Sequence, residues 1–151
     1  MNEQGALIVL RGVTKVYRKG PQTIRALDGI DLEVAEKGMV AIVGLSGSGK
    51  SSLLHIVGAM DRATSGEVRV AGQALNSLRE GELTRFRRQT VGFVFQTFNL
   101  IPNLTALENV MLPMEFNGVP APERRQRASG LLARGGLGKR LDHQPRELSG
   151  G

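Results

Sequence analysis

Eight consecutive residues have the composition and spacing of a phosphate-binding loop. The sequence from position 44 to position 51 reads GLSGSGKS and fits the pattern G-x-x-x-x-G-K-[ST] at every fixed position. Its glycines allow a tight turn and a close approach of the backbone to a ligand that a Cβ would exclude. The Lys50 side chain adds a positive charge for β- and γ-phosphates, and the Ser51 hydroxyl can bind Mg²⁺. These residue types predict a nucleoside-triphosphate site. The residues assigned to it are Gly44, Ser46, Gly47, Ser48, Gly49, Lys50, Ser51 and Ser52.

The segments on either side of the loop support this interpretation. Residues 39–43 form a continuous apolar run, which is typical of a strand buried on both faces. Residues 51–60 carry apolar side chains at helical spacing. The N-terminus of such a helix points backbone N–H groups, here from about Gly47 to Ser52, at one bound anion. The alternative is a glycine-rich turn with an incidental lysine, and the two flanking segments argue against it.

The remaining pattern divides the chain into an α/β half and a helical half. In the helical half, Thr105 and Glu108 have the spacing of a capping box, which marks the start of a helix. Short strands are expected at residues 7–10, 13–17, 30–34, 66–70 and 91–95, and helices at 80–89, 105–116 and 122–133. We therefore predict a nucleotide-binding α/β core over residues 1–95 and a helical subdomain over residues 96–151.

Composition excludes several other classes of protein. The 151 residues include no Cys, so a disulfide scaffold, a thiolate zinc site and a cysteine nucleophile are ruled out. No apolar stretch approaches the roughly 20 residues of a membrane span, and the first residues do not have the pattern of a signal peptide. The formal charge of +6 comes largely from arginines expected on exposed helix faces. Because aromatic residues are not interleaved with these arginines, we do not expect nucleic-acid binding.

Four features occur in the order found in ATP-binding-cassette (ABC) ATPases, and the chain resembles that family over essentially its whole length. They are an aromatic residue in the N-terminal strands (Tyr17), the loop at 44–51, Gln96 directly after a predicted strand, and the final Leu148-Ser149-Gly150-Gly151. The resemblance implies an α/β P-loop NTPase fold. Its RecA-like core carries antiparallel N-terminal strands and is followed by the start of an α-helical subdomain, with the C-terminal part missing.

The resemblance also assigns roles to these residues, with ATP and Mg²⁺ as the cofactors. Tyr17 would stack on adenine, although an aromatic residue at the end of a strand can also belong to the core. Gln96 would join Ser51 in binding Mg²⁺ and would help to place the attacking water, so that Lys50 and Gln96 are the catalytic residues present. The segment Ser149, Gly150 and Gly151 would contact the ATP of a second subunit, in a head-to-tail homodimer that encloses two nucleotides.

A narrower resemblance concerns residues 91–102 and 104–113. These segments look like the branch that contains the ATPases of lipoprotein release and macrolide export, with the cell-division ATPase as a near relative, and residues 61–67 fit the same branch. The resemblance implies a transmembrane permease as partner and a cytoplasmic location, peripheral on the inner face of the cell membrane. Residues 98–116 would grip the permease, although packing within the helical half would use the same side chains.

Two elements of the family pattern have no match in the sequence. The family continues past the signature to an apolar strand that ends in Asp-Glu and then to a switch histidine, and none of the 14 acidic residues follows a strand in that way. His55 lies within the predicted helix after the loop, and His143 precedes the signature, so neither is the switch. We therefore expect a truncated chain that does not hydrolyse ATP by itself. Two alternatives are a soluble ABC-type ATPase without a permease and a nucleotide-binding module that does not hydrolyse ATP.

Overall fold

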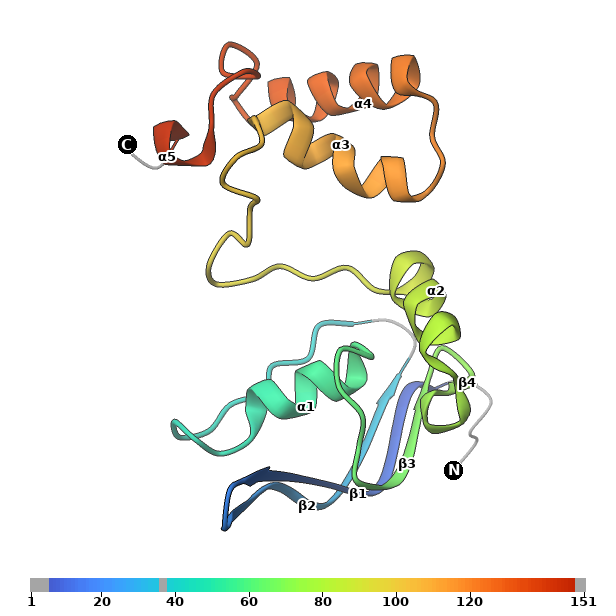
Figure 1. The fold of residues 1–151 in the computed structure, drawn as a ribbon. Helices are drawn as coiled ribbons and strands as arrows, with labels where there is room; N and C mark the ends of the chain where they lie inside the picture. The colour runs from blue at the N-terminus through green and yellow to red at the C-terminus, as the bar shows by residue number, and fades with distance from the viewer. Residues whose placement is uncertain (1–5, 36–37, 149–151) are drawn as a thin grey trace. The chain divides into compact units, whose positions relative to one another are not determined.

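The computed structural model describes residues 6–35 and 38–148. These residues form two compact units, the first ending at Phe93 and the second beginning at Val94 (Figure 1). No helix among the described residues is long and apolar enough to cross a membrane.

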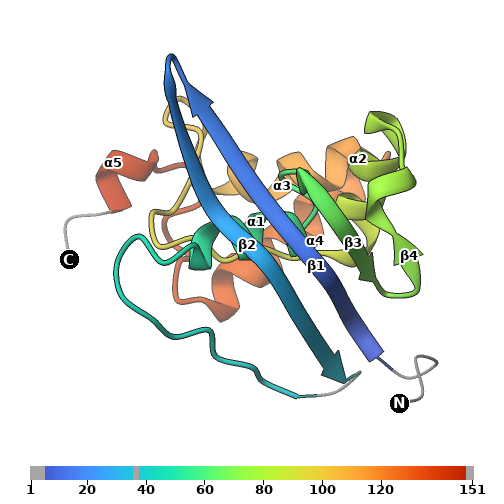
Figure 2. The same ribbon diagram turned by 90° about the horizontal axis from the view of Figure 1, so that it is seen from below.

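The first unit contains an antiparallel sheet of four strands in the order β2-β1-β3-β4 (Figure 2). The strands are β1 (Ala6–Lys19), β2 (Gln22–Ala35), β3 (Ser65–Val70) and β4 (Gln73–Ala74). The runs predicted at residues 7–10 and 13–17 are therefore parts of one long strand. Gly12, which separates them in the sequence, has φ 56° and lies where the register of β1 shifts. The local irregularity is a bulge rather than a turn.

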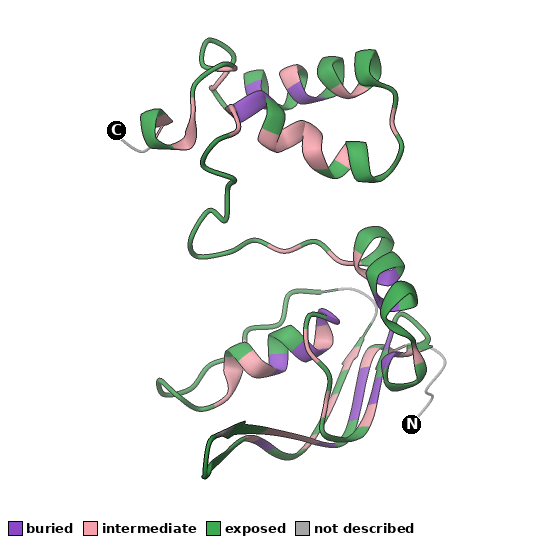
Figure 3. Cartoon of the chain, in the orientation of Figure 1, coloured by how far each residue is buried: buried purple, intermediate pink, exposed green. Residues whose placement is uncertain are grey.

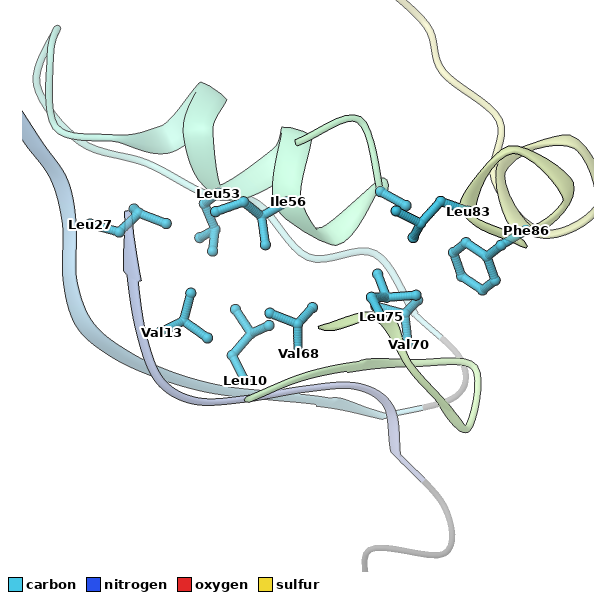
Figure 4. Packing of buried hydrophobic residues seen from close by; sticks show 11 residues of the cluster. Leu10, Val13, Leu27, Leu53, Ile56, Val68, Val70, Leu75, Leu83 and Phe86 are labelled. Carbon is cyan, nitrogen blue, oxygen red and sulfur yellow. The ribbon is translucent and has the colours of Figure 1, made fainter. Parts of the chain in front are cut away.

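Two helices and one short 3₁₀ turn pack on this sheet. They are α1 (Lys50–Val57), η2 (Leu75–Ser77) and α2 (Glu80–Thr90), and both helices were predicted within a few residues. Their apolar faces meet the sheet in a single core, shown in Figure 4. Its buried side chains are Leu10, Val13, Leu27, Leu53, Ile56, Ala59, Val68, Val70, Leu75, Leu83 and Phe86. This core fixes the position of α1, whose N-terminus follows directly from the glycine-rich loop.

The strands predicted at residues 39–43 and 91–95 are absent, and this part of the sequence prediction was wrong for the structure. Neither segment forms a strand. Both are largely exposed (Figure 3), and the exposed fraction is 99% for Met39 and complete for Val94. Ile42 and Val91 of these segments pack against the core as partly buried side chains. A strand requires pairing with a neighbouring strand, and the sheet that the described residues form contains only β1, β2, β3 and β4.

The second unit consists of α3 (Ala106–Phe116), α4 (Ala121–Arg134) and the short α5 (Pro145–Leu148). The predicted capping box is confirmed. The Glu108 N–H donates to Thr105 Oγ1 at 3.2 Å, and the Thr105 N–H donates to Glu108 Oε2 at 2.8 Å. These bonds from the Thr105 N–H and hydroxyl lower the pKa of the Glu108 carboxyl. The small core of this unit contains Ala106, Leu107, Ala128 and Leu132.

Candidate functional site

The N-terminus of α1 is open toward an anion. Gly49 is its N-cap residue and has φ 89°, no side chain caps the helix, and the first turn contains no acidic residue. Backbone N–H groups at a helix start that no side chain accepts from are the usual donors to a phosphate group. A negatively charged ligand therefore fits this end of α1, whereas a cation would be opposed by the helix dipole.

Lys50 turns back onto its own loop. Its ammonium donates to the carbonyl oxygens of Gly44 at 2.9 Å and Leu45 at 2.6 Å, and Ser48 Oγ lies 3.4 Å away. These acceptors are all neutral and belong to the loop that a phosphate would fill. Because a charged oxygen is a stronger acceptor for an ammonium than a carbonyl, a phosphate in the loop would compete for Lys50. The lysine is therefore already held beside the position that the sequence assigns to the phosphates.

Gly49 allows the loop to lie against β2. A Cβ built at Gly49 would be 2.3 Å from the carbonyl oxygen of Ala26, which is closer than real Cβ contacts. Gly47 differs, because a Cβ there would meet nothing within 4 Å, although its φ of 81° also favours glycine. Close approach between loop and sheet thus depends on Gly49, whereas Gly47 serves only the turn.

Tyr17 is not a core residue, which was the alternative interpretation of this aromatic side chain. It lies on β1, is 37% exposed, and donates its hydroxyl hydrogen to Asp61 Oδ2 at 2.9 Å. Its Oη also lies 3.4 Å from Oγ of Ser52, in the first turn of α1. The structure therefore places the predicted adenine-binding side chain in contact with Ser52, which was predicted to belong to the phosphate site.

Sequence reasoning missed Asp61 and Lys15 as neighbours of this site. Burial by itself raises the pKa of the Asp61 carboxyl. Hydrogen bonds from Lys15, from Tyr17 and from the Arg62 N–H, together with the Lys15 charge, outweigh burial and lower that pKa. Asp61 is therefore a carboxylate at neutral pH. The only sequence signal for it was the likeness of residues 61–67 to one branch of the family, which said nothing about Tyr17.

The roles predicted for the other site residues are not tested by the described structure. Gln96 is an exposed residue of the second unit, and Ser149, Gly150 and Gly151 lie outside the described residues. Within the described ranges, no group of three or more His, Cys, Asp or Glu side chains could hold a metal ion. The roles of these residues therefore stay predictions.

The second unit has an apolar cavity of about 540 Å³. It lies between the segment before α3 and the end of the described chain, and Phe98 in its wall is 81% exposed. Leu107, by contrast, is buried in the core of the same unit. Residues 98–116 thus include side chains that pack inside the unit and side chains that face outward, and their contact with a permease stays a prediction. The cavity is lined by Phe98, Asn99, Leu100, Leu137, Pro145, Arg146 and Leu148.

Comparison with known proteins agrees with this fold. Residues 27–151 match the family model described as ABC transporter, and the chain therefore belongs to the ABC transporter family. A solved dimeric ATP-binding cassette in a post-hydrolysis state, bound to ADP and Pi, is similar in structure with a TM-score of 0.85 and 46% identity. The match covers 95% of this chain and 63% of that one. The predicted fold class is confirmed.

Curated relatives place the chain near one branch of the family. An uncharacterized ABC transporter ATP-binding protein of Thermotoga maritima is 51% identical over 92% of this chain and 59% of its own length. The lipoprotein-releasing system ATP-binding protein LolD of Pseudomonas fluorescens is 47% identical over 97% of this chain and 64% of its length. The macrolide export ATP-binding/permease protein MacB of Hyphomonas neptunium is 46% identical over 96% of this chain and 22% of its length. The predicted resemblance to the lipoprotein-release and macrolide-export branch is confirmed, and the chain spans less than two thirds of each of these relatives.

Proposed function

We propose that this chain is the ATP-binding part of an ABC transporter subunit that drives export or lipoprotein release. The observation that carries the proposal is the glycine-rich loop, with Lys50 held inside it, at the uncapped N-terminus of α1. Membership of the ABC transporter family and the names of the relatives support it. We place ATP hydrolysis in a longer protein, of the length that the relatives have.

Different residues would bind the phosphates, the Mg²⁺ ion and the adenine of ATP. Backbone N–H groups from Gly47 to Ser52 and the Lys50 ammonium would hold the β- and γ-phosphates. Mg²⁺ prefers hard oxygen ligands, and the Ser51 hydroxyl and the Gln96 amide oxygen are of that type. When bound, Mg²⁺ would neutralise charge on the phosphates. Tyr17 would stack on the adenine, and its exposed ring is consistent with that role.

The last residues of the chain would act on the nucleotide of a second subunit. The proposal is supported by the dimeric state of the similar solved cassette. In a head-to-tail homodimer, Ser149, Gly150 and Gly151 of one subunit would face the ATP bound to the loop of the other. ATP binding would then need one subunit, and turnover would need two.

Replacing Ser149 by arginine is expected to separate these two steps. In the longer protein, Ser149→Arg should leave equilibrium ATP binding within about twofold of wild type, because the loop at 44–51 is unchanged. Steady-state turnover should fall to background, because the bulky cation would occupy the position of the γ-phosphate of the partner. Binding is measured by calorimetry and turnover by phosphate release.

Ser129→Arg on α4 is a matched control, since Ser129 also lies in the second unit but far from the signature in sequence. It should retain turnover. A Ser149→Arg protein that is monomeric at saturating ATP and still fully active would contradict the role in the dimer.

A transmembrane permease is the partner that we propose for the second unit. The relative LolD is named as part of a lipoprotein-releasing system, and the relative MacB is named as an ATP-binding/permease protein. The cavity beside Phe98 is largely apolar and open, which suits a short helix of a partner. Such a complex would place the protein at the inner face of the cell membrane.

Replacing Phe98 by aspartate is expected to weaken association with the permease at least about tenfold, because an apolar anchor would become a charge. ATP affinity should not change. Leu131→Asp is the matched control, since Leu131 is 50% exposed in the same unit but does not line the cavity. Co-purification and ATP titration of both variants test this surface. Equal loss of permease by both variants would show that the cavity is not the binding site.

A further inference from the structure

The Tyr17 hydroxyl contacts one residue in the first turn of α1 and one in the loop that follows this helix. Ser52, in the first turn, lies 3.4 Å from the phenol oxygen, and Asp61, in the loop after the helix, accepts the phenol hydrogen at 2.9 Å. Tyr17 itself belongs to β1. The ring therefore links the sheet to the same helix whose N-terminus forms the phosphate loop.

Asp61 is itself fixed by two donors. Lys15 Nζ donates to Asp61 Oδ1 at 2.6 Å, and the Arg62 N–H donates to the same oxygen at 2.7 Å. The Lys15 ammonium also donates to the Arg62 carbonyl oxygen at 2.7 Å. The side chains of Lys15 and Asp61 are only 12% and 30% exposed, so this pair is shielded more than an ordinary surface ion pair. The carboxylate that receives the Tyr17 hydroxyl is thus restrained on its other side.

One face of the Tyr17 ring is occupied by the same lysine. Lys15 Nζ lies over the ring, 4.8 Å from its centroid, which is within the range of a cation–π contact. Lys15 and Tyr17 are two residues apart on β1, and the register of the strand shifts between Lys15 and Val16. The cation thus lies against one face of the ring, and Tyr17 as a whole is 37% exposed.

From this geometry we infer that Asp61 is a positioning residue for nucleotide binding, which orients the Tyr17 ring for the base and does not touch the nucleotide. Lys15 holds Asp61 and covers one face of the ring. The inference rests on the proposed function, since it assumes that Tyr17 stacks on the base. A ring that is fixed before the nucleotide arrives loses less conformational freedom on binding, so its contact with the base contributes more to affinity.

Two ligands distinguish this role from a structural one. ATP uses both the loop and the ring, whereas inorganic tripolyphosphate can use only the loop. Calorimetric titration of both ligands, with Mg²⁺, would be carried out on the wild type, Asp61→Ala, Tyr17→Phe and the double variant. Asp28→Ala is the matched control, because Asp28 is an exposed carboxylate of the same unit that pairs with Arg25 instead.

We expect Asp61→Ala and Tyr17→Phe each to weaken ATP binding about fivefold, the effect of losing one hydrogen bond. The double variant should be no weaker than either single variant, because both remove the same contact. Tripolyphosphate affinity should be unchanged in all of them, and Asp28→Ala should behave as the wild type.

Three results would overturn this inference and leave the proposed function standing. They are an equal loss of ATP and tripolyphosphate binding in Asp61→Ala, additive losses in the double variant, and an ATP affinity that is unchanged in the single variants. Tyr17→Phe keeps the ring and removes only the hydroxyl, so it gives an answer even if Asp61→Ala does not fold. A wild-type protein that binds neither ligand would overturn the proposed function as well.

Discussion

Replacing Lys50 by alanine is expected to weaken ATP binding by about two orders of magnitude, the loss of two hydrogen bonds to charged acceptors. The ammonium lies within the loop and donates only to neutral oxygens of Gly44 and Leu45 among its short contacts, so it is available to a phosphate. Removing it leaves the backbone donors of α1 but takes away the only full positive charge of the loop. The measurement is calorimetric titration with ATP at fixed ionic strength.

Lys139→Ala is the control for the change in net charge. Lys139 is an exposed lysine of the second unit, and its removal lowers the charge of the chain by the same amount. It should leave ATP affinity within about twofold of wild type, because Lys139 is not part of the loop and an exposed charge is screened by salt. Undiminished ATP affinity in Lys50→Ala would refute the assignment of the loop.

The second large effect is expected from Gly49→Ala, which should lower the free energy of unfolding by at least about 3 kcal/mol. Two penalties add at this position. The φ of 89° is unfavourable for an L-residue, and the new Cβ would lie 2.3 Å from the carbonyl oxygen of Ala26. Because that atom belongs to the backbone of β2, relief requires movement of either the sheet or the start of α1. Urea unfolding measures the change.

Gly47→Ala separates the two penalties. It has a φ of 81° but free space around the new Cβ, so only the backbone term applies and the expected loss is about 1–2 kcal/mol. Gly49→Ala should also weaken ATP binding by more than Gly47→Ala, because it displaces the helix N-terminus. Equal destabilisation by the two variants would mean that the approach of the loop to Ala26 has no energetic importance.

The sequence was most informative where structure depends on neighbouring residues. The helix after the loop, the charged helix α2 and the capping box at Thr105 were all predicted within a few residues. In each of them, the periodicity of apolar residues or the cap itself lies within one short segment. The phosphate loop belongs to the same group, because its glycines, Lys50 and Ser51 are consecutive or nearly so.

The strands were less predictable, because pairing involves residues far apart in the sequence. The apolar runs at 39–43 and 91–95 have the composition of buried strands, yet neither pairs with a strand of the sheet that the described residues form, and both are largely exposed. Conversely, the two runs on either side of Gly12 belong to one strand, because β2 and β3 pair with both of them. Composition indicates that a segment can be buried in a sheet, and only the fold provides the sheet.

The surroundings of Tyr17 show the same division at the level of one side chain. The sequence by itself identified the glycine-rich loop as the candidate phosphate site, the helix that follows it and the family, because these depend on consecutive residue types and their order. It could not predict that Tyr17 donates to Asp61, 44 residues away, or that Lys15 lies over its ring. Those contacts exist because the packing of α1 on the sheet brings the loop after the helix against β1. Tertiary structure alone therefore decided how the proposed base-binding residue is held.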